Sequence, residues 1–396
     1  MLFEADRHAP LTRTPWDEAA ARAAIVRILA DTEDAMGADV SWPWHPLDVE
    51  EKPEPAHKSL YLGAAGVVAA LATLQRMGFA SPRRDPRDLA APLHAAYLAA
   101  PDTGAVVPSY FLGEAGILLV QWRLARPVQV AQRLHDVVAA NAENPTREAL
   151  WGAPGTMLAA WHMYRWSGEA RWAALWRTSA DALWHSWEQH DAGRWLWTQS
   201  LYGRDERYLG AAHGFAGNVY ALLQGRALLA PERSDELVAR CANTLAATAE
   251  VDGDGANWPP APGAGKRLMQ WCHGAPGIVT SLAVLPPGLS PVVDDLLLRA
   301  GHAIWRAGPL AKGAGLCHGT AGNGCAFLKL YTRTGDAVWL ARARGFAMHA
   351  MAQADAALVE FGQRRHTLWT GDPGLAVFLA NCIAASDAIP TLDEVT

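Results

Sequence analysis

Two short segments of the chain place a cysteine directly before a histidine. The first is Gln270-Trp-Cys-His-Gly, and the second is Gly315-Leu-Cys-His-Gly. Thiolate and imidazole are ligands that zinc prefers, with four in a closed structural site and three plus water in an open catalytic one. The two matched pairs therefore predict a metal site that draws on Cys272, His273, Cys317 and His318.

The number of ligands is left open by the spacing. Adjacent residues point in different directions, so four ligands on one ion would need contorted loops, and three with an open position are physically easier. A helix that starts behind each cysteine would favour its thiolate form. The competing interpretation is a pair of buried core cysteines with hydrogen-bonded histidines. The matched placement of the two Cys-His pairs in two repeats argues against this interpretation. The other cysteines, at 241, 325 and 382, have no such histidine and are expected to be core thiols.

A Gly-x-x-Gly motif follows each Cys-His pair and recurs along the chain, with first glycines 39 to 62 residues apart. Most of these motifs open an apolar, Ala/Leu-rich run. The seven pairs are Gly63/Gly66, Gly113/Gly116, Gly152/Gly155, Gly214/Gly217, Gly274/Gly277, Gly319/Gly322 and Gly371/Gly374. Amphipathic segments between them, with a period of about 3.6 residues, predict further helices over 87–99, 127–140, 170–188, 234–250, 291–306 and 337–354.

About seven helix pairs with scarce strand signals predict an all-α fold. Repeated pairs must bury their apolar faces against neighbours, so they stack into an open solenoid or close into a ring. Glycines at the helix starts allow the close backbone approach that a crowded ring centre requires, and we favour a seven-fold α/α toroid. We expect one domain over residues 1–396, in which residues 1–56 form an N-terminal helix (16–36) and a Pro-rich lead-in. Residues 42–57, 191–207 and 251–266 are predicted as loops.

The composition is that of a globular protein with a large core, because 51% of the residues are hydrophobic and 19% are charged. A net charge of -6 offers no basic patch, so nucleic acid is not an expected partner. The first thirty residues lack an apolar signal-peptide region, and the long uncharged stretch 268–293 is interrupted by prolines, so no membrane helix is expected there. Few cysteines, odd in number and without framework spacing, favour a cytoplasmic protein.

Three segments carry a resemblance to a known family. They are Trp271-Cys-His-Gly-Ala-Pro-Gly, Gly315-Leu-Cys-His-Gly-Thr-Ala-Gly-Asn and Tyr208-Leu-Gly-Ala-Ala-His-Gly-Phe-Ala-Gly. They resemble the lanthionine synthetase C-like family, which comprises the bacterial lantibiotic cyclases and their eukaryotic relatives, and the seven glycine motifs extend the resemblance over nearly the whole chain. The resemblance implies a seven-fold α/α toroid and one zinc held by Cys272, Cys317 and His318. His273 would then stand off the metal, where many cyclases have tyrosine and the eukaryotic relatives have histidine.

The resemblance also implies an activity, the zinc-dependent addition of a thiol to dehydroalanine or dehydrobutyrine. Such an addition needs a proton donor, and the resemblance points to His213, with a capping or hydrogen-bonded histidine as the alternative. Glu148 stands where the family has an acidic residue with an acid/base or positioning role, although a charge before a helix is also routine. Lys312 resembles a lysine of the eukaryotic relatives that could hold a carboxylate or an enolate, or it is simply solvated. Leu268 stands where many cyclases have an arginine.

The thiol could belong to a peptide cysteine or to a small molecule such as glutathione, and a dehydratase would be a partner outside the chain. Similarity to the eukaryotic relatives favours a stand-alone protein. Two other classes compete: a non-catalytic zinc-containing scaffold or peptide- or thiol-binding sensor, and a carbohydrate-processing α/α toroid, which would need two carboxylates such as Glu148 and Asp372. Aromatic residues near the helix starts are expected in part to line a cleft: Tyr61, Phe111, Trp151, Trp271 and Trp369. Asp372 is expected to cap a helix.

Overall fold

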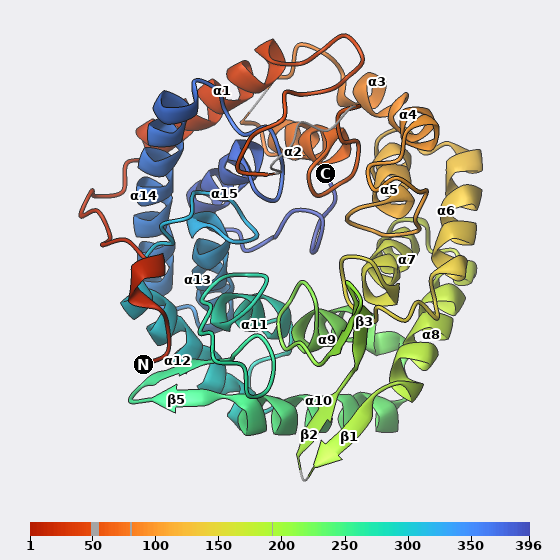
Figure 1. The fold of residues 1–396 in the computed structure, drawn as a ribbon, viewed down its shortest axis with the longest axis vertical. Helices are drawn as coiled ribbons and strands as arrows, with labels where there is room; N and C mark the ends of the chain where they lie inside the picture. Colours follow the sequence, from red (N-terminus) through yellow and green to blue (C-terminus); the bar gives the residue numbers. More distant parts are fainter. Residues whose placement is uncertain (49–54, 80, 192) are drawn as a thin grey trace. The chain divides into compact units, whose positions relative to one another are not determined.

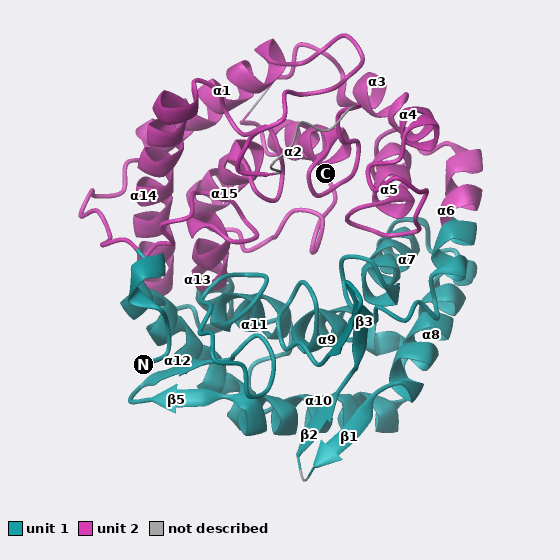
Figure 2. Ribbon diagram, in the orientation of Figure 1, with its two compact units in different colours: residues 1–8, 135–308, 329–336 teal, residues 9–134, 309–328, 337–396 magenta. Residues whose placement is uncertain are grey.

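The computed structural model describes residues 1–48, 55–79, 81–191 and 193–396, and these residues are mostly helical (Figure 1). The chain divides into two compact units, each built from separate segments (Figure 2). Unit 1 contains residues 1–8, 135–308 and 329–336, and unit 2 contains residues 9–134, 309–328 and 337–396. The expectation of a single domain over residues 1–396 stays a prediction.

Seven helices begin at the residue directly after the first glycine of a motif, as predicted. They are α2 (Ala64–Arg76), α5 (Glu114–Ala125), α7 (Ala153–Ser167), α9 (Phe215–Gln224), α11 (Ala275–Leu282), α13 (Thr320–Thr334) and α15 (Asp372–Ala384). Asp372 is thus the first residue of α15 and Gly371 is the N-cap, so the expectation that Asp372 caps the helix is wrong.

The second glycine of the motif has a packing reason. A Cβ at Gly217 would lie less than 3 Å from the carbonyl oxygen of Ala211, and one at Gly277 would lie equally close to that of Trp271. In each case the chain before the helix folds back onto the first helical turn, and only a residue without a side chain leaves room for it. The motif therefore marks a repeated loop-to-helix turn, which is why it predicts the helix starts so well.

The remaining helices follow the amphipathic segments. They are α1 (Glu18–Asp34), α3 (Pro86–Ala90), α4 (Leu93–Ala99), α6 (Val128–Ala140), α8 (Ala170–His185), α10 (Pro231–Thr248), α12 (Pro291–Ala307) and α14 (Ala337–Phe361), with short 3-10 helices at Ala5–Arg7 and Arg226–Leu228. The predicted N-terminal helix is confirmed as α1. The predicted helix over 87–99 is instead two helices, because Pro92 has no N–H to continue the first. Part of the Pro-rich lead-in, 49–54, lies outside the described residues.

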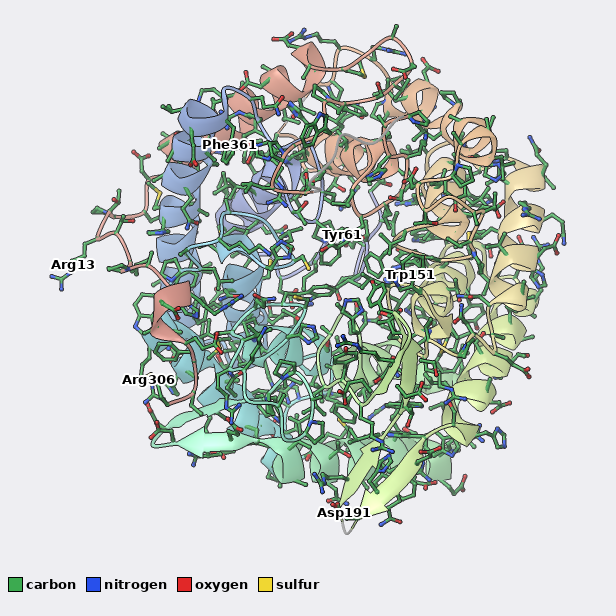
Figure 3. The ribbon with its side chains drawn as sticks, viewed as in Figure 1. Arg13, Tyr61, Trp151, Asp191, Arg306 and Phe361 are labelled. Atoms are coloured by element: carbon green, nitrogen blue, oxygen red, sulfur yellow. The ribbon has the colours of Figure 1, made fainter. Side chains whose placement is uncertain are left out.

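The stretch 191–207 contains short hairpins, so its prediction as a loop is wrong. In 251–266 the prediction is wrong for the hairpin that ends at Asn257 and right for residues 258–266, which form a loop. Strand β1 (Glu188–Asp191) pairs with β2 (Arg194–Leu196), β3 (Gln199–Leu201) with β4 (Arg204–Glu206), and β5 (Glu250–Asp252) with β6 (Gly255–Asn257), all antiparallel. Arg306 of α12, labelled in Figure 3, donates a hydrogen bond of 2.6 Å to Asp254 and so ties the β5–β6 turn to that helix.

Within each unit, each glycine-opened helix named below packs against neighbouring helices. In unit 1, α7 packs against α8 and α9, and α11 packs against α9 and α12. In unit 2, α15 packs against α14 and against α2, the first glycine-opened helix. The first and last repeats of an open solenoid do not touch, so the contact between α2 and α15 favours ring closure. No helix among the described residues is long and apolar enough to cross a membrane.

Candidate active site

The loops that lead into the glycine-opened helices are joined by backbone hydrogen bonds. In unit 1 the N–H of Ala149 donates to the carbonyl of Ala212 (3.2 Å), and the N–H of Ala212 donates to the carbonyl of Cys272 (3.5 Å). These three loops precede α7, α9 and α11. The bonds bring the side chains that precede these helices to one end of the three helices.

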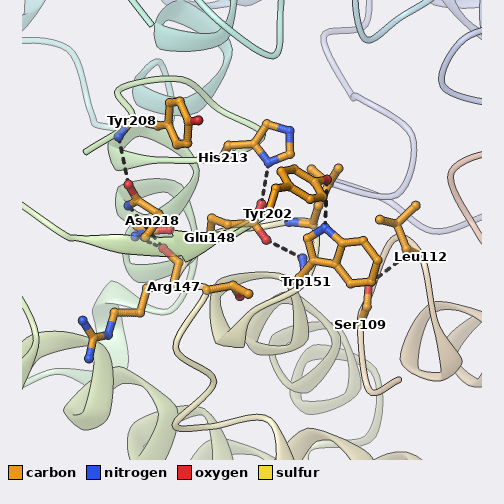
Figure 4. Close-up of polar contacts among 12 residues, drawn as sticks. Ser109, Leu112, Arg147, Glu148, Trp151, Tyr202, Tyr208, His213 and Asn218 are labelled. Carbon is orange, nitrogen blue, oxygen red and sulfur yellow. Dashed lines mark hydrogen bonds and ion pairs between the residues drawn. The ribbon is translucent and has the colours of Figure 1, made fainter. Parts of the chain in front are cut away.

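His213 and Glu148 form an ion pair at this end of unit 1. The Nδ1 atom of His213 lies 2.9 Å from Oε2 of Glu148 (Figure 4). The Glu148 side chain is completely buried, whereas that of His213 keeps 19% of its exposure. A carboxylate at Nδ1 fixes the ring orientation and leaves Nε2 as the nitrogen that can exchange a proton with a ligand. The structure therefore brings together two of the residues that the sequence singled out.

Glu148 is held by the start of α7 as well as by the histidine. Its Oε2 accepts a hydrogen bond from the N–H of Leu150 (3.0 Å), and its Oε1 accepts one from the N–H of Trp151 (2.6 Å). Both donors belong to the loop that ends at Gly152, the N-cap of α7. Glu148 thus bonds to the N–H groups before a helix, as a carboxylate at this place routinely does, and it also contacts His213.

The backbone before Glu148 is in an unusual conformation. Arg147 has a φ of 45°, which a non-glycine residue adopts only at a cost. Its carbonyl accepts a hydrogen bond from Nδ2 of Asn218 (2.8 Å), a fully buried residue of α9, and a longer one from Nε2 of Gln199 (3.4 Å). This contact of Asn218 reaches a residue 71 positions away and supports the turn that presents Glu148.

The two histidines of unit 1 are pushed toward opposite protonation states. Burial by itself lowers the pKa of His213. The hydrogen bond and the charge of Glu148, with a smaller contribution from Cys272, raise this pKa by more than burial lowers it, so the pKa lies above its ordinary value. Burial lowers the pKa of His273, and the nearby His213 adds to this effect. The two rings lie 5.8 Å apart between centroids. His213 is thus the better proton donor of the two, and His273 favours the neutral form.

Cys272 lies in a tight turn beside this pair. The N–H and C=O groups of Gln270 and His273 bond to each other across the turn, and Nε2 of Gln270 donates to the Cys272 sulfur at 2.9 Å. Gly210 is required here, because a Cβ at that position would meet the Cys272 carbonyl and the His273 ring. A hydrogen bond to sulfur favours a thiolate, which is the form that binds a metal.

Cys317 and His318 occupy the corresponding place in unit 2. They precede Gly319 and α13, and the N–H of Cys317 donates to the carbonyl of Trp369 at 2.8 Å. Cys317 is buried and His318 is half-buried. Two thiols and an imidazole are a donor set that suits zinc. The three cysteines expected to be core thiols are all buried, namely Cys241, Cys325 and Cys382.

Lys312 and Asp372 belong to unit 2 and line a pocket of about 240 Å³ together with Gln353 and Arg365. Lys312 is exposed at its rim. Asp372 accepts a hydrogen bond from Arg364 at 3.4 Å, and burial raises its pKa to about 6. The structure does not place either residue in the Glu148–His213 group of unit 1.

The aromatic residues near the helix starts divide into two kinds. Phe111 and Trp369 are fully buried and Trp271 is 3% exposed, so these three belong to the core and not to a cleft. Tyr61 and Trp151, labelled in Figure 3, are half-buried. Tyr202, which lies beside His213, was not among the predicted site residues. The Tyr-Gly pair between two short alternating segments is the signal that could have located its turn.

Comparison with known proteins identifies the family. Residues 54–393 match the family described as lanthionine synthetase C-like protein. The chain belongs to this family. The resemblance carried by the Cys-His and His-Gly segments is thereby confirmed.

Individual relatives of this lanthionine synthetase C-like chain match it over shorter stretches. The Danio rerio protein named glutathione S-transferase LANCL1 is 39% identical over 145 residues, which are 36% of this chain and 35% of the relative. The Arabidopsis thaliana LanC-like protein GCL1 is 36% identical over 152 residues, which are 37% of this chain and 34% of the relative. The chain thus matches about a third of the length of these curated relatives.

Among solved structures, nisin cyclase matches with a TM-score of 0.63 and 15% sequence identity, over 92% of this chain and 94% of that chain. At this identity the match speaks for the fold and not for the activity. It confirms the predicted fold class, an all-α protein of the α/α toroid type.

Glu148→Gln is expected to lower the pKa of His213. The substitution removes the charge and part of the hydrogen bonding that raise this pKa, and the lowering effect of burial remains. A raised pKa in the folded state stabilises the protein below the unfolded pKa, and this stabilisation is lost as the pH rises through the folded pKa. NMR titration of the imidazole resonances measures the shift directly. A matched exchange, Glu143→Gln in the same loop, should leave His213 unchanged, and an unaltered His213 pKa in Glu148→Gln would contradict the pairing.

Proposed function

We propose that this chain binds one zinc ion through Cys272, Cys317 and His318 and adds a thiol to a dehydroamino acid to form a thioether. Family membership supports the proposal, and so does the observation that these three side chains are a group that could hold a metal ion. The observation that carries the catalytic part is the Glu148–His213 pair, which lies in the same set of joined loops as Cys272.

A zinc ion bound by these residues would supply Lewis acidity, which keeps a thiol deprotonated and nucleophilic at neutral pH. Three protein ligands leave a position open for the substrate. Cys272 and Cys317 each precede a helix N-terminus, which stabilises a thiolate ligand. Burial lowers the pKa of His273, which favours the neutral imidazole beside the ligands.

The proton needed by the addition comes from His213. The thiolate sulfur bonds to the β-carbon of dehydroalanine or dehydrobutyrine, the carbon–carbon π bond breaks, and its electrons move onto the α-carbon and the adjoining carbonyl. Protonation of the α-carbon completes the thioether. His213, with a raised pKa and with Nδ1 held by Glu148, donates this proton from Nε2. The proton that the thiol releases on deprotonation restores the imidazolium through solvent.

Glu148 acts by orienting the His213 ring and stabilising its charged form. Lys312, exposed at the rim of a pocket in unit 2, would hold a substrate carboxylate. The name of the Danio rerio relative supports a glutathione-like thiol, and the description of the family as lanthionine synthetase C-like supports a peptide cysteine. Either thiol requires a dehydrated acceptor, so a dehydratase is the partner reaction, and the cytoplasm is the proposed location.

The proposal is tested on the purified chain by metal analysis combined with a thiol-addition assay. The substrates are glutathione and a short dehydroalanine peptide, and a second peptide carries both dehydroalanine and cysteine. We expect one zinc per chain, loss of thioether formation after chelation and recovery on adding zinc. Full activity in metal-free protein would refute the zinc assignment. Zinc-loaded protein that adds neither thiol would indicate the scaffold or sensor instead.

A further inference from the structure

The β3–β4 hairpin carries Tyr202 to the side of the Glu148–His213 pair. The hairpin has a two-residue turn, Tyr202 and Gly203, with φ values of 54° and 72°. Positive φ at both central residues is the pattern of tight hairpin turns in which asparagine or aspartate normally precedes glycine. A tyrosine in the first of these positions is unusual.

Local stability does not explain this tyrosine. A side chain with a Cβ is strained at positive φ, and Tyr202 is also 70% exposed, so little apolar burial compensates the strain. Strain that local packing does not explain is found preferentially at functional sites. The backbone conformation of the turn therefore does not account for a tyrosine at this position.

The Tyr202 ring faces the acid–base pair. Its centroid lies 6.4 Å from that of His213, and Trp151 lies on its other side at 6.5 Å, with both partners close to perpendicular to it (Figure 4). The indole Nε1–H of Trp151 donates a hydrogen bond of 3.2 Å to the Tyr202 hydroxyl. The rings of exposed Tyr202 and half-buried Trp151 thus lie next to each other, with the Tyr202 ring beside the His213 imidazole.

The base of the hairpin is tied to the segment that presents Glu148. Fully buried Gln199 donates to the Arg147 carbonyl and accepts a hydrogen bond from the N–H of Tyr208 at 2.8 Å. Ser200 donates to Asp205 across the two strands at 2.7 Å. These contacts fix the hairpin relative to His213, so the Tyr202 ring is held in place and is not a freely moving loop residue.

We propose that Tyr202 is a specificity-determining residue whose ring stacks on the dehydroamino acid of the acceptor substrate. The inference rests on the proposed function, because it places the acceptor α-carbon at His213. A dehydroamino acid is planar at its α- and β-carbons and conjugated with the adjoining carbonyl, so it stacks on an aromatic face. A saturated residue has a tetrahedral α-carbon and cannot lie flat on the ring. Tyr202 thus selects the unsaturated residue over its saturated counterpart before the thiol reacts.

The test measures peptide binding without thiol, so that no turnover occurs. Zinc-loaded wild type and Tyr202→Asn are titrated by calorimetry with a dehydroalanine peptide and with the same peptide carrying alanine. Wild type should prefer the dehydroalanine peptide by roughly three- to tenfold, the range of a single aromatic stacking contact. Tyr202→Asn should lose the preference, and Tyr202→Phe should keep it because the ring remains.

The urea midpoint of unfolding gives a second readout, which separates a role of Tyr202 in substrate selection from a role in stabilising the fold. Asparagine tolerates positive φ, so Tyr202→Asn should raise the urea midpoint while it weakens selection. Ala385, with a φ of 50° at the end of α15, supplies the control: Ala385→Asn should raise the midpoint and leave peptide selection unchanged. An unchanged preference in Tyr202→Asn, or a lowered midpoint, overturns the proposal. Selective binding by wild type without any thiol addition would instead reject the proposed function and keep the role of Tyr202.

Discussion

Cys317→Ala is expected to purify with little or no zinc and to lose thioether formation. The proposed site has three protein ligands, which is the minimum for a zinc site with an open position, so the loss of one thiolate leaves only two. We expect zinc affinity to fall by at least about 100-fold, because zinc–thiolate bonds supply much of the binding free energy. Metal analysis after dialysis against a weak chelator measures the loss.

Cys325→Ala is the matched control for this variant. Cys325 is a buried thiol in α13, eight residues after Cys317, and has no part in the proposed metal site. Both substitutions remove one buried sulfur from the same part of the chain, so they share the cost of a small cavity. Retention of a full zinc equivalent by Cys317→Ala, or equal losses in the two variants, would reject Cys317 as a ligand.

The helix starts could be predicted because their cause is local. A second glycine such as Gly277 is required by the carbonyl of Trp271 six residues before it, and both groups lie within one short stretch of sequence. The break at Pro92 was equally local, because proline lacks the N–H that a continuing helix needs. The helical periodicity continues through the segment 87–99, but the proline alone is enough to end α3.

The hairpins could not be predicted from propensity. The β3–β4 turn uses tyrosine where turn statistics favour asparagine, so its sequence resembles an irregular polar loop. Its geometry depends on contacts from distant parts of the chain, such as the bond from Gln199 to Arg147, which lies 52 positions away. When contacts from distant segments stabilise a turn whose residues do not favour that conformation, the sequence of the turn gives little indication of it.

The candidate site shows the same division between local and distant information. The residue types and their position before the glycine located Cys272, and the resemblance to the family pointed to His213. The sequence could not show that Glu148 bonds to His213 across 65 positions, nor that Asn218 supports the strained Arg147 peptide. These contacts shift the two pKa values in opposite directions, because Glu148 raises the pKa of His213, whereas burial lowers that of His273, which has no carboxylate partner among its described contacts. The sequence motifs thus identify the candidate site residues, and the contacts between distant segments indicate what each of them can do.

His213→Asn is expected to retain zinc and to lower kcat for thiol addition by about 10²- to 10⁴-fold, the usual contribution of a positioned general acid. The wild-type rate should fall as the pH rises through the raised pKa of His213, because only the imidazolium donates a proton. Asparagine does not titrate in this range, so the variant should lose that limb of the pH–rate profile. A stopped-flow or mass-spectrometric assay from pH 6 to about 9 covers the expected range.

His185→Asn provides the control for this substitution. His185 is an exposed histidine at the end of α8 whose Nδ1 contacts only the Asp181 carbonyl among the hydrogen bonds of the described residues. The same exchange there should change neither kcat nor the pH profile. Since His213 and Glu148 act as one unit, the double variant of His213→Asn with Glu148→Gln should be about as slow as His213→Asn alone. If the fold-losses in kcat of the two single variants instead multiply in the double variant, Glu148 acts on the substrate independently of His213.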